Sequence, residues 1–281
     1  MTMGAEMMAA GLVGGIGVFC AVVLGIASRY FAVFEDPRIE TLTNLLPGAN
    51  CGSCGLAGCS EYARAIVMKG AALDMCKPGG RETALNLGAA MGVEVALRER
   101  EVAMVMCGGG DAEASRMFRY NGIADCTAAA LISGGDKTCR FGCLGLGTCA
   151  RVCPARAIEI LPGRLALVHP ELCVGCGLCV KACPKGLIRL VPESRSLHVL
   201  CSSRDKGAAV RKYCKTGCIA CGICAKLADG AIRIDENLAV VDYAKAFEND
   251  EVVRKCPQHT IVRRPGQAGI PAAAAEAARA E

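Results

Sequence analysis

The chain has 281 residues, of which 21 are cysteine, and its formal net charge at neutral pH is +5. This length predicts one to three domains, and packing alone does not require so many cysteines. The basic residues are scattered and are not interleaved with aromatic side chains on which bases stack, which argues against nucleic-acid binding. Many cysteines recur two or three residues apart, a spacing that favours metal ligation over a disulfide framework.

The first expected element is a membrane anchor within residues 1–30. Residues 7–28 carry no charge and are about long enough to span the hydrocarbon core of a bilayer. A cleavable signal peptide is the alternative, but such a peptide starts with basic residues, and no Lys or Arg precedes Arg29. Arg29 and Arg38 follow the span, so the positive-inside rule predicts a single pass through the inner (cytoplasmic) membrane, with the bulk of the chain in the cytoplasm.

A set of four cysteines follows in a predicted small helical domain, residues 31–95. The stretch CGSCGLAGC and one later cysteine space the thiols by two, four and sixteen residues, and the intervening glycines permit tight turns and N–H donation to sulfur. This pattern predicts a [4Fe–4S] cluster, with a structural zinc site as the alternative. Apolar spacing between the third and fourth cysteine predicts a helix there. The predicted ligands are Cys51, Cys54, Cys59 and Cys76.

A second group of cysteines lies in the predicted domain 136–200, after a predicted linker segment, residues 96–135. The sequence CVGCGLCVKACP matches the bacterial ferredoxin run, in which the cysteine before proline ligates the other cluster of a pair. CRFGCLGLGTCARVCP supplies the partner motif, and its Pro154 marks the second crossing ligand. The two predicted ligand sets are Cys139, Cys143, Cys149 and Cys183 for one cluster, and Cys153, Cys173, Cys176 and Cys179 for the other.

Cys139 is the least secure of these eight ligands. The spacing of its motif departs from the standard run, and a different local loop would put Cys126 in its place. Short apolar segments follow each Cys-Pro pair, and we predict hairpins that pair residues 155–161 with 164–170 and residues 185–191 with 196–200. The whole region is expected to be an internal two-fold repeat.

The third region, residues 201–262, contains an incomplete ferredoxin motif. Three closely spaced cysteines lack a following Cys-Pro pair, and a lone Cys-Pro pair appears far downstream. By the crossing rule these two halves complete each other and predict one cluster. Its ligands are Cys218, Cys221, Cys224 and Cys256, and segments 231–235 and 238–243 are predicted to form its hairpin.

The predicted clusters therefore number four, and some cysteines remain unassigned. We interpret Cys107, Cys126, Cys201 and Cys214 as buried free thiols, with a swapped ligand at Cys126 or Cys214 as the alternative. Cys20 lies inside the predicted anchor. The tail, residues 263–281, is rich in Ala, Gly and Pro and is predicted to be disordered. No nucleophile with a base, no paired carboxylates and no dinucleotide fingerprint is found, so no catalytic residue is predicted.

With this order of anchor, four-cysteine domain and ferredoxin motifs, the chain resembles the RnfB/RsxB family, a family of iron–sulfur subunits of the Rnf complex, the ion-translocating ferredoxin:NAD oxidoreductase. The resemblance implies an α+β iron–sulfur subunit of an oxidoreductase complex, without a substrate-converting site of its own. It implies relay of electrons from reduced ferredoxin toward an NAD-linked flavoprotein subunit, with further membrane subunits as partners. An electron-transfer polyferredoxin subunit of another membrane oxidoreductase, of the hydrogenase or formate dehydrogenase type, is the alternative. The coupling ion, Na⁺ or H⁺, stays open.

Overall fold

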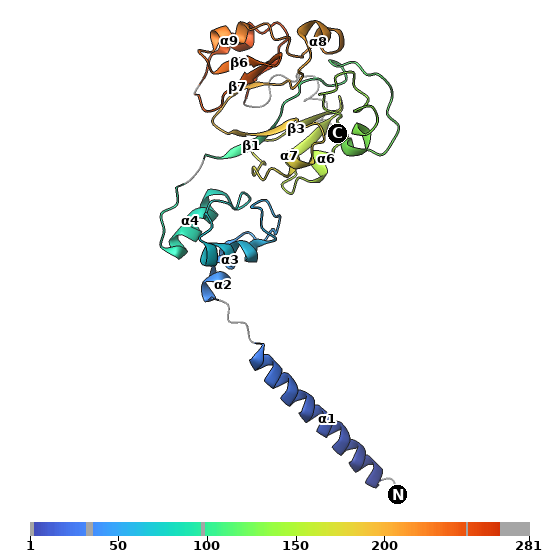
Figure 1. The fold of residues 1–281 in the computed structure, drawn as a ribbon, viewed down its shortest axis with the longest axis vertical. Coiled ribbons are helices and arrows are strands. Elements are labelled where there is room, and N and C mark those ends of the chain that lie inside the picture. Colours follow the sequence, from blue (N-terminus) through green and yellow to red (C-terminus); the bar gives the residue numbers. More distant parts are fainter. Residues whose placement is uncertain (1–2, 32–35, 97–98, 246, 265–281) are drawn as a thin grey trace.

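The computed structural model describes residues 3–31, 36–96, 99–245 and 247–264. It confirms an α+β chain with a long N-terminal helix, a small helical domain and two modules of short strands and helices (Figure 1). Most of the predicted disordered tail, from residue 265 onward, lies outside the described residues.

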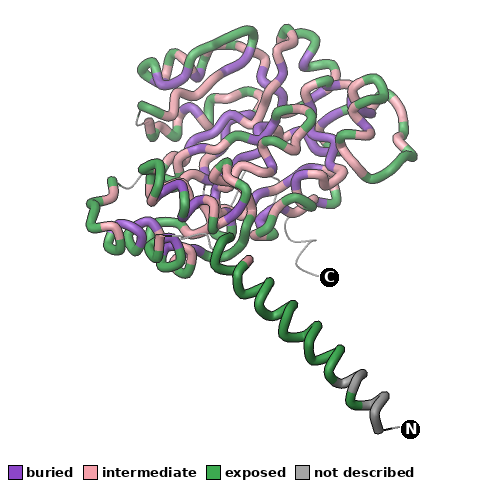
Figure 2. Tube along the Cα trace, turned by 60° about the horizontal axis from the view of Figure 1, so that its bottom comes forward, coloured by how far each residue is buried: buried purple, intermediate pink, exposed green. Residues whose placement is uncertain are grey.

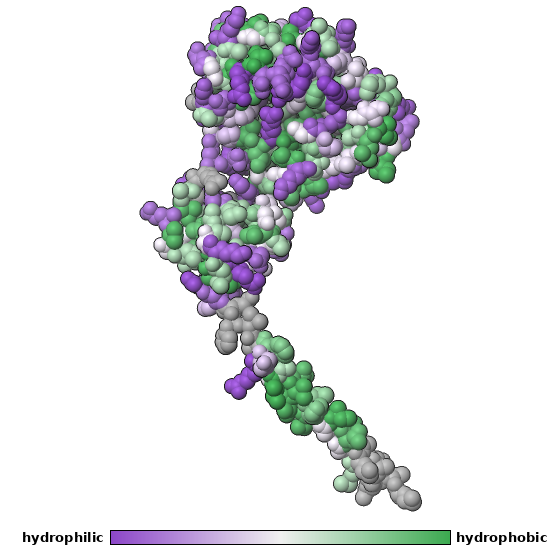
Figure 3. All heavy atoms as spheres, viewed as in Figure 1, coloured by the Kyte–Doolittle hydropathy of each residue, from purple (hydrophilic) through white to green (hydrophobic). Residues whose placement is uncertain are grey.

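The first helix, α1 (Met3–Tyr30), is the predicted anchor. Its segment Gly11–Tyr30 is long and apolar enough to cross a membrane, and the part of that segment that best fits a membrane span is not buried against the rest of the protein. Figure 2 colours nearly all the described residues of α1 as exposed, and Figure 3 shows that they are largely hydrophobic. An exposed apolar helix of this kind is stable only when another apolar phase surrounds it.

The small helical domain contains α2 (Pro37–Leu45), α3 (Cys59–Lys69) and α4 (Gly80–Met91). The helix predicted between the third and fourth cysteine is confirmed as α3. Leu42, Tyr62 and Leu87 are buried where these helices meet. The Tyr62 hydroxyl donates to the carbonyl of Ala72 at 2.7 Å and accepts from the backbone N–H of Met75 at 3.2 Å. It thereby fixes the loop that leads to the fourth cysteine.

The first ferredoxin-like module is built on two pairs of antiparallel strands. β1 (Glu101–Val105) pairs with β4 (Ile188–Pro192), and β2 (Ile158–Leu161) pairs with β3 (Leu165–Val168) as a hairpin. Three short helices accompany the strands: α5 (Cys126–Ala130), α6 (Thr148–Arg151) and α7 (Leu178–Ala182). Strand and cysteine side chains share one core, so the thiol groups are part of the packing.

The second module repeats this plan. β5 (Leu197–Val199) pairs with β8 (Ile261–Arg263), and β6 (Ile232–Asp235) forms the inner hairpin with β7 (Leu238–Val241). Its helices are α8 (Gly207–Tyr213), α9 (Ile223–Leu227) and α10 (Asp250–Arg254). In both modules the first strand pairs with the last and encloses the hairpin in the sequence. The repeat thus relates the two modules to each other, whereas the sequence analysis expected a repeat within residues 136–200.

One predicted hairpin is wrong. Residues 185–191 do not pair with 196–200, because their strand β4 pairs with β1, in the register Val102↔Val191 and Val105↔Ile188. The second segment instead forms β5, which starts the next module. The apolar run of β1 lies in the predicted linker 96–135, and all but its first residue is buried. This burial draws β1 into the core of the first module.

Candidate metal centres

The N-terminal set of cysteines surrounds the start of α3. Gly52 and Gly55 have φ of +66° and +85°, which lets the loop turn tightly between the first three thiols. The Asn50 side chain accepts from the backbone N–H of Cys59 at 2.8 Å and holds the loop to the helix. Burial raises the pKa of Cys76, and Cys59, Cys51 and Cys54 also raise it, so the structure brings all four thiols together.

In the first module the structure brings Cys153 to the three cysteines of the other motif. Burial raises the pKa of Cys179 to about 12, with further contributions from Cys173, Cys176 and Cys153. The backbone N–H of Ala157 donates to Cys153 Sγ at 3.3 Å, as amide donors commonly do around cluster thiolates. This grouping matches the predicted crossing of motifs.

The second group in this module includes Cys126 in place of Cys139. Four cysteines line a hollow between α5, α6 and the segment after α7. Burial and then Cys126 and Cys183 raise the pKa of Cys149 to about 11. Cys139 lines a different hollow, so its position favours the alternative left open by the sequence. The four members are Cys126, Cys143, Cys149 and Cys183.

Cys126 is held in this group by a local hydrogen-bond network. Its backbone N–H donates to Thr148 Oγ1 at 2.7 Å, and the Thr148 hydroxyl donates to Asp125 at 2.8 Å. Asp125 also caps α5 by accepting from the N–H groups of Thr127 and Ala128. These hydrogen bonds, together with that from Arg151, hold the pKa of Asp125 at about 2. The carboxylate is therefore ionised at neutral pH, and it ties α5 to α6.

We expect Thr148→Val to weaken the cluster held with Cys126. The substitution keeps the shape of the side chain but removes the acceptor for the Cys126 N–H, at a cost of about 1 kcal/mol. Anaerobic iron release from the full chain should become faster for this one centre. Thr127→Val is the matched control, because Thr127 is exposed on α5, the helix that begins at Cys126. Equal release rates in both variants would contradict the assigned role of Thr148.

The set in the second module follows the predicted ligands. Another hollow is lined by Cys218, Cys221, Cys224 and Cys256. Burial raises the pKa of Cys224 to about 11, and Cys218, Cys221 and Cys256 contribute. Cys221 is exposed, so this set of thiols reaches the surface of the module.

A third hollow is lined in part by cysteines that the sequence analysis interpreted as free thiols. Cys139 lines it together with Cys107, Cys201 and Cys214. These residues come from four segments distant in the sequence, which is why local spacing did not group them.

Comparison with known proteins places these cysteine sets in a family. A family model described as a putative Fe-S cluster matches residues 46–78, and one described as a 4Fe-4S binding domain matches residues 166–189. The chain is 43% identical over 251 residues to the B-type subunit of the ion-translocating oxidoreductase complex of Methanosarcina acetivorans, covering 89% of this chain and 95% of the relative. The chain belongs to the RnfB family, the B-type subunits of ion-translocating oxidoreductase complexes.

Two further relatives agree with this assignment to the RnfB family. The B-type subunit of the Na(+)-translocating ferredoxin:NAD(+) oxidoreductase complex of Acetobacterium woodii is 44% identical, over 89% of this chain and 76% of the relative. The B-type subunit of the proton-translocating ferredoxin:NAD(+) oxidoreductase complex of Clostridium ljungdahlii is 39% identical, over 88% of each. Membership implies other complex subunits as partners, and together with α1 it supports association with a membrane.

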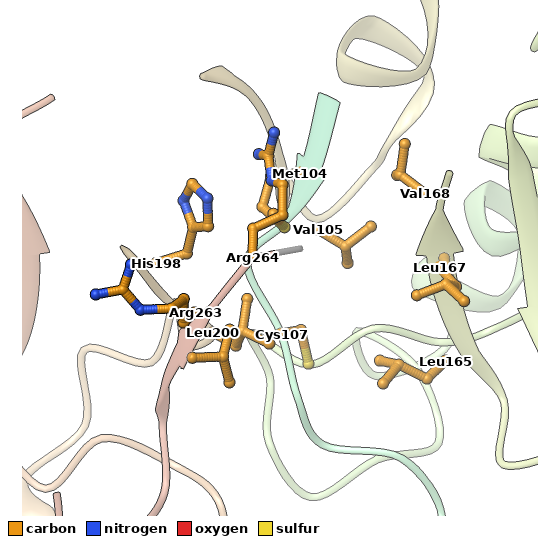
Figure 4. A pocket seen from close by; sticks show the side chains of 12 residues that line it. Met104, Val105, Cys107, Leu165, Leu167, Val168, His198, Leu200, Arg263 and Arg264 are labelled. Atoms are coloured by element: carbon orange, nitrogen blue, oxygen red, sulfur yellow. The ribbon is translucent and has the colours of Figure 1, made fainter. Parts of the chain in front are cut away.

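This member of the RnfB family also has an apolar hollow that contains no cysteine set. It is lined by strand residues of both modules, with His198 and Arg264 at one side and Cys107 beside Leu200 (Figure 4). Burial and the nearby Arg264 lower the pKa of His198 to about 4, and its Nδ1 lies 2.9 Å from the Tyr243 hydroxyl. His198 is therefore neutral at pH 7 and acts as a buried hydrogen-bonding group.

Proposed function

We propose that this chain is the electron-transfer subunit of an ion-pumping Rnf complex, and that it relays electrons from reduced ferredoxin toward the NAD-linked flavoprotein subunit. The observation that carries the proposal is the succession of four-cysteine sets from the domain next to α1 to the far module. A [4Fe–4S] cluster bound at each set supplies one-electron redox chemistry. The protein residues supply thiolates, amide donors and exclusion of water.

The proposed ligands form four sets, with Cys126 taken in preference to Cys139. They are Cys51, Cys54, Cys59 and Cys76; Cys126, Cys143, Cys149 and Cys183; Cys153, Cys173, Cys176 and Cys179; and Cys218, Cys221, Cys224 and Cys256. Burial raises the pKa of at least one thiol in each set above its usual value. Without iron, the thiols with a raised pKa would be protonated at neutral pH. Iron binding therefore releases protons.

The spread of the thiols favours clusters over single zinc ions. A zinc ion bonds its thiolates at about 2.3 Å and so draws four sulfurs closely together. Within the described parts of the chain, no group of three or more Cys, His, Asp or Glu side chains is close enough to hold one metal ion. A four-iron cluster binds thiolates that are spread more widely, and the cysteines of two of the sets line shared hollows.

The proximity of neighbouring sets supports a continuous electron path. Cys179 contributes to the raised pKa of Cys149, so the two sets of the first module adjoin each other. Cys51 likewise contributes to the raised pKa of Cys176, which relates the N-terminal set to the first module. An ion pair between Lys77 and Glu101, 3.6 Å long, joins the small domain to β1.

We further infer that α1 crosses the inner membrane once, through lipid contacts of residues 7–28, and that the cluster-bearing part lies in the cytoplasm. Arg29 directly after the span supports this orientation. The anchor keeps the N-terminal cluster near the membrane subunits of the complex. The far module then remains accessible to a soluble donor.

The basic residues around α8 are the proposed ferredoxin-docking surface. Ferredoxins are mostly acidic, and opposite charge speeds their encounter. Arg204 adds less positive charge to this surface than its neighbours do, because it forms an ion pair with Glu236 at 3.0 Å. Figure 3 shows hydrophilic side chains gathered over the part of the molecule that holds α8 and α9. The exposed basic members are Lys206, Arg211, Lys212 and Lys215.

We expect the double variant Arg211→Glu, Lys212→Glu to accept electrons from ferredoxin at least tenfold more slowly at low salt, because it reverses two charges at the docking surface. Stopped-flow reduction by ferredoxin over a salt series measures this, and the salt slope should shrink. Dithionite reduction should be unchanged. Lys69→Glu, Arg81→Glu is the matched control, since both residues are exposed on α3 and α4 of the small helical domain. An unchanged rate constant and slope would refute docking at α8.

A further inference from the structure

The hollow between the two modules is a candidate metal site that the four proposed clusters do not use. Its cysteines, Cys107, Cys139, Cys201 and Cys214, line one shared hollow, as do the cysteines of the two hollows assigned to clusters above. Burial raises the pKa of Cys139 to about 11, and Cys107 and Cys214 contribute to that rise. We propose that these four thiolates hold a fifth [4Fe–4S] cluster at the junction of the modules.

The four cysteines occupy equivalent positions in the two repeats. Cys107 stands two residues after the end of β1, and Cys201 stands two residues after the end of β5. Cys139 precedes Cys143 by four residues, and Cys214 precedes Cys218 by four. Each module thus contributes one pair, and the site lies where the related pairs face each other. Free thiols without a shared role would not be expected at equivalent positions in both modules.

Hydrogen-bond donors surround the sulfurs of this site as they surround those of the other sets. The backbone N–H of Cys143 donates to Cys107 Sγ at 3.5 Å. In the other module the backbone N–H of Cys218 donates to Cys201, and the N–H of Ser203 donates to the same sulfur at 3.4 Å. Donation to thiolate sulfur stabilises a ligated cluster and sets its potential.

The backbone and charge around the hollow also fit a cluster. A Cβ at Gly109 would lie 3.3 Å from Cys214 Sγ and would narrow the space between the thiols. Lys137 is 1% exposed and donates to the carbonyl of Gly109 at 2.6 Å. Within the described residues no carboxylate forms an ion pair with Lys137. A buried cation is costly unless it is balanced. Lys137 acts electrostatically on Cys143 of the first-module set, and negative charge at that set and in the adjoining hollow would offset this cost.

The fifth cluster would bridge the two modules, an interpretation that rests on the function proposed above. Cys107 contacts the backbone of Cys143, a proposed ligand of the first module, and Cys201 contacts that of Cys218, a proposed ligand of the second. Without a centre in the hollow, nothing redox-active would lie between these two sets. With it, every cysteine after α1 belongs to a set, and only Cys20 within α1 is left over.

Counting iron in the full chain, purified anaerobically in detergent and reconstituted, tests the fifth cluster. The proposal predicts about twenty iron atoms per chain, whereas four clusters alone give about sixteen. Cys107→Ala and Cys214→Ala should each lose up to four atoms, and the double variant should lose no more than four. Cys20→Ala is the matched control and should keep the full count.

A wild-type count near sixteen, unchanged in both single variants, would overturn the proposal while leaving the four-cluster function intact. A count near eight or below would instead overturn the proposed function itself. If the variants lose more than four atoms through misfolding, the wild-type count decides between about twenty and about sixteen. Mössbauer spectra of the wild type and of Cys214→Ala provide a second measurement, because the variant should lack one fifth of the cluster signal.

Discussion

Replacing Cys183 by alanine is expected to destroy the cluster of Cys126, Cys143 and Cys149 and to spare that of its own sequence neighbours. Cys183 is only four residues from Cys179, yet it lines the hollow of the other set. The backbone N–H of Leu187 donates to Cys183 Sγ at 3.5 Å and holds the thiol toward that hollow. Anaerobic EPR and Mössbauer spectra should show one centre lost or converted to a three-iron form.

The symmetry of the module provides the mirror experiment. Cys153→Ala should damage the cluster of Cys173, Cys176 and Cys179, because Cys153 lies with these residues. Comparison of the two spectra identifies each centre by its missing signal. If Cys183→Ala removed the same signal as Cys179→Ala, the crossing of ligands between motifs would be refuted.

Removal of iron is expected to unfold both ferredoxin-like modules. Their helices have four to seven residues and their sheets have two strands, elements that are marginal by themselves. Cysteines Cys143, Cys149, Cys173 and Cys179 are part of the buried core of the first module, so the clusters take the place of apolar side chains there. Loss of metal would leave hollows that the surrounding residues cannot fill.

Anaerobic stripping of oxidised protein with an iron chelator measures this effect. Absorbance of the clusters and the far-ultraviolet circular dichroism of the strands should fall together, while the signal of the long helix α1 persists. Incubation with dithionite alone is the control, because it reduces the clusters without removing them. A chain that loses all its iron and keeps its strand signal would show that hydrophobic packing alone supports the modules.

Local spacing in the sequence predicted much of the architecture. The inner hairpins and helix α3 follow from apolar periodicity within a few residues, and the structure confirms them. The pairing of β1 with β4 was missed because it joins segments over eighty residues apart. Cys126 was retained as an alternative to Cys139, whereas the hollow with Cys139 was missed for the same reason. The spacing of cysteines indicates which residues share a loop, whereas shared cavities depend on tertiary packing.

The closing strand pairs have a consequence for synthesis on the ribosome. Each module pairs its first strand with its last. The first module therefore cannot complete its sheet until β4 has left the ribosome, and the second module cannot do so until β8, almost at the end of the described chain, has left it. The small helical domain has all its cysteines within residues 51–76 and can mature earlier. Domains generally fold in order from the N-terminus as they emerge. The domain beside the membrane helix would therefore receive its iron first, while the module farthest from it receives its iron last.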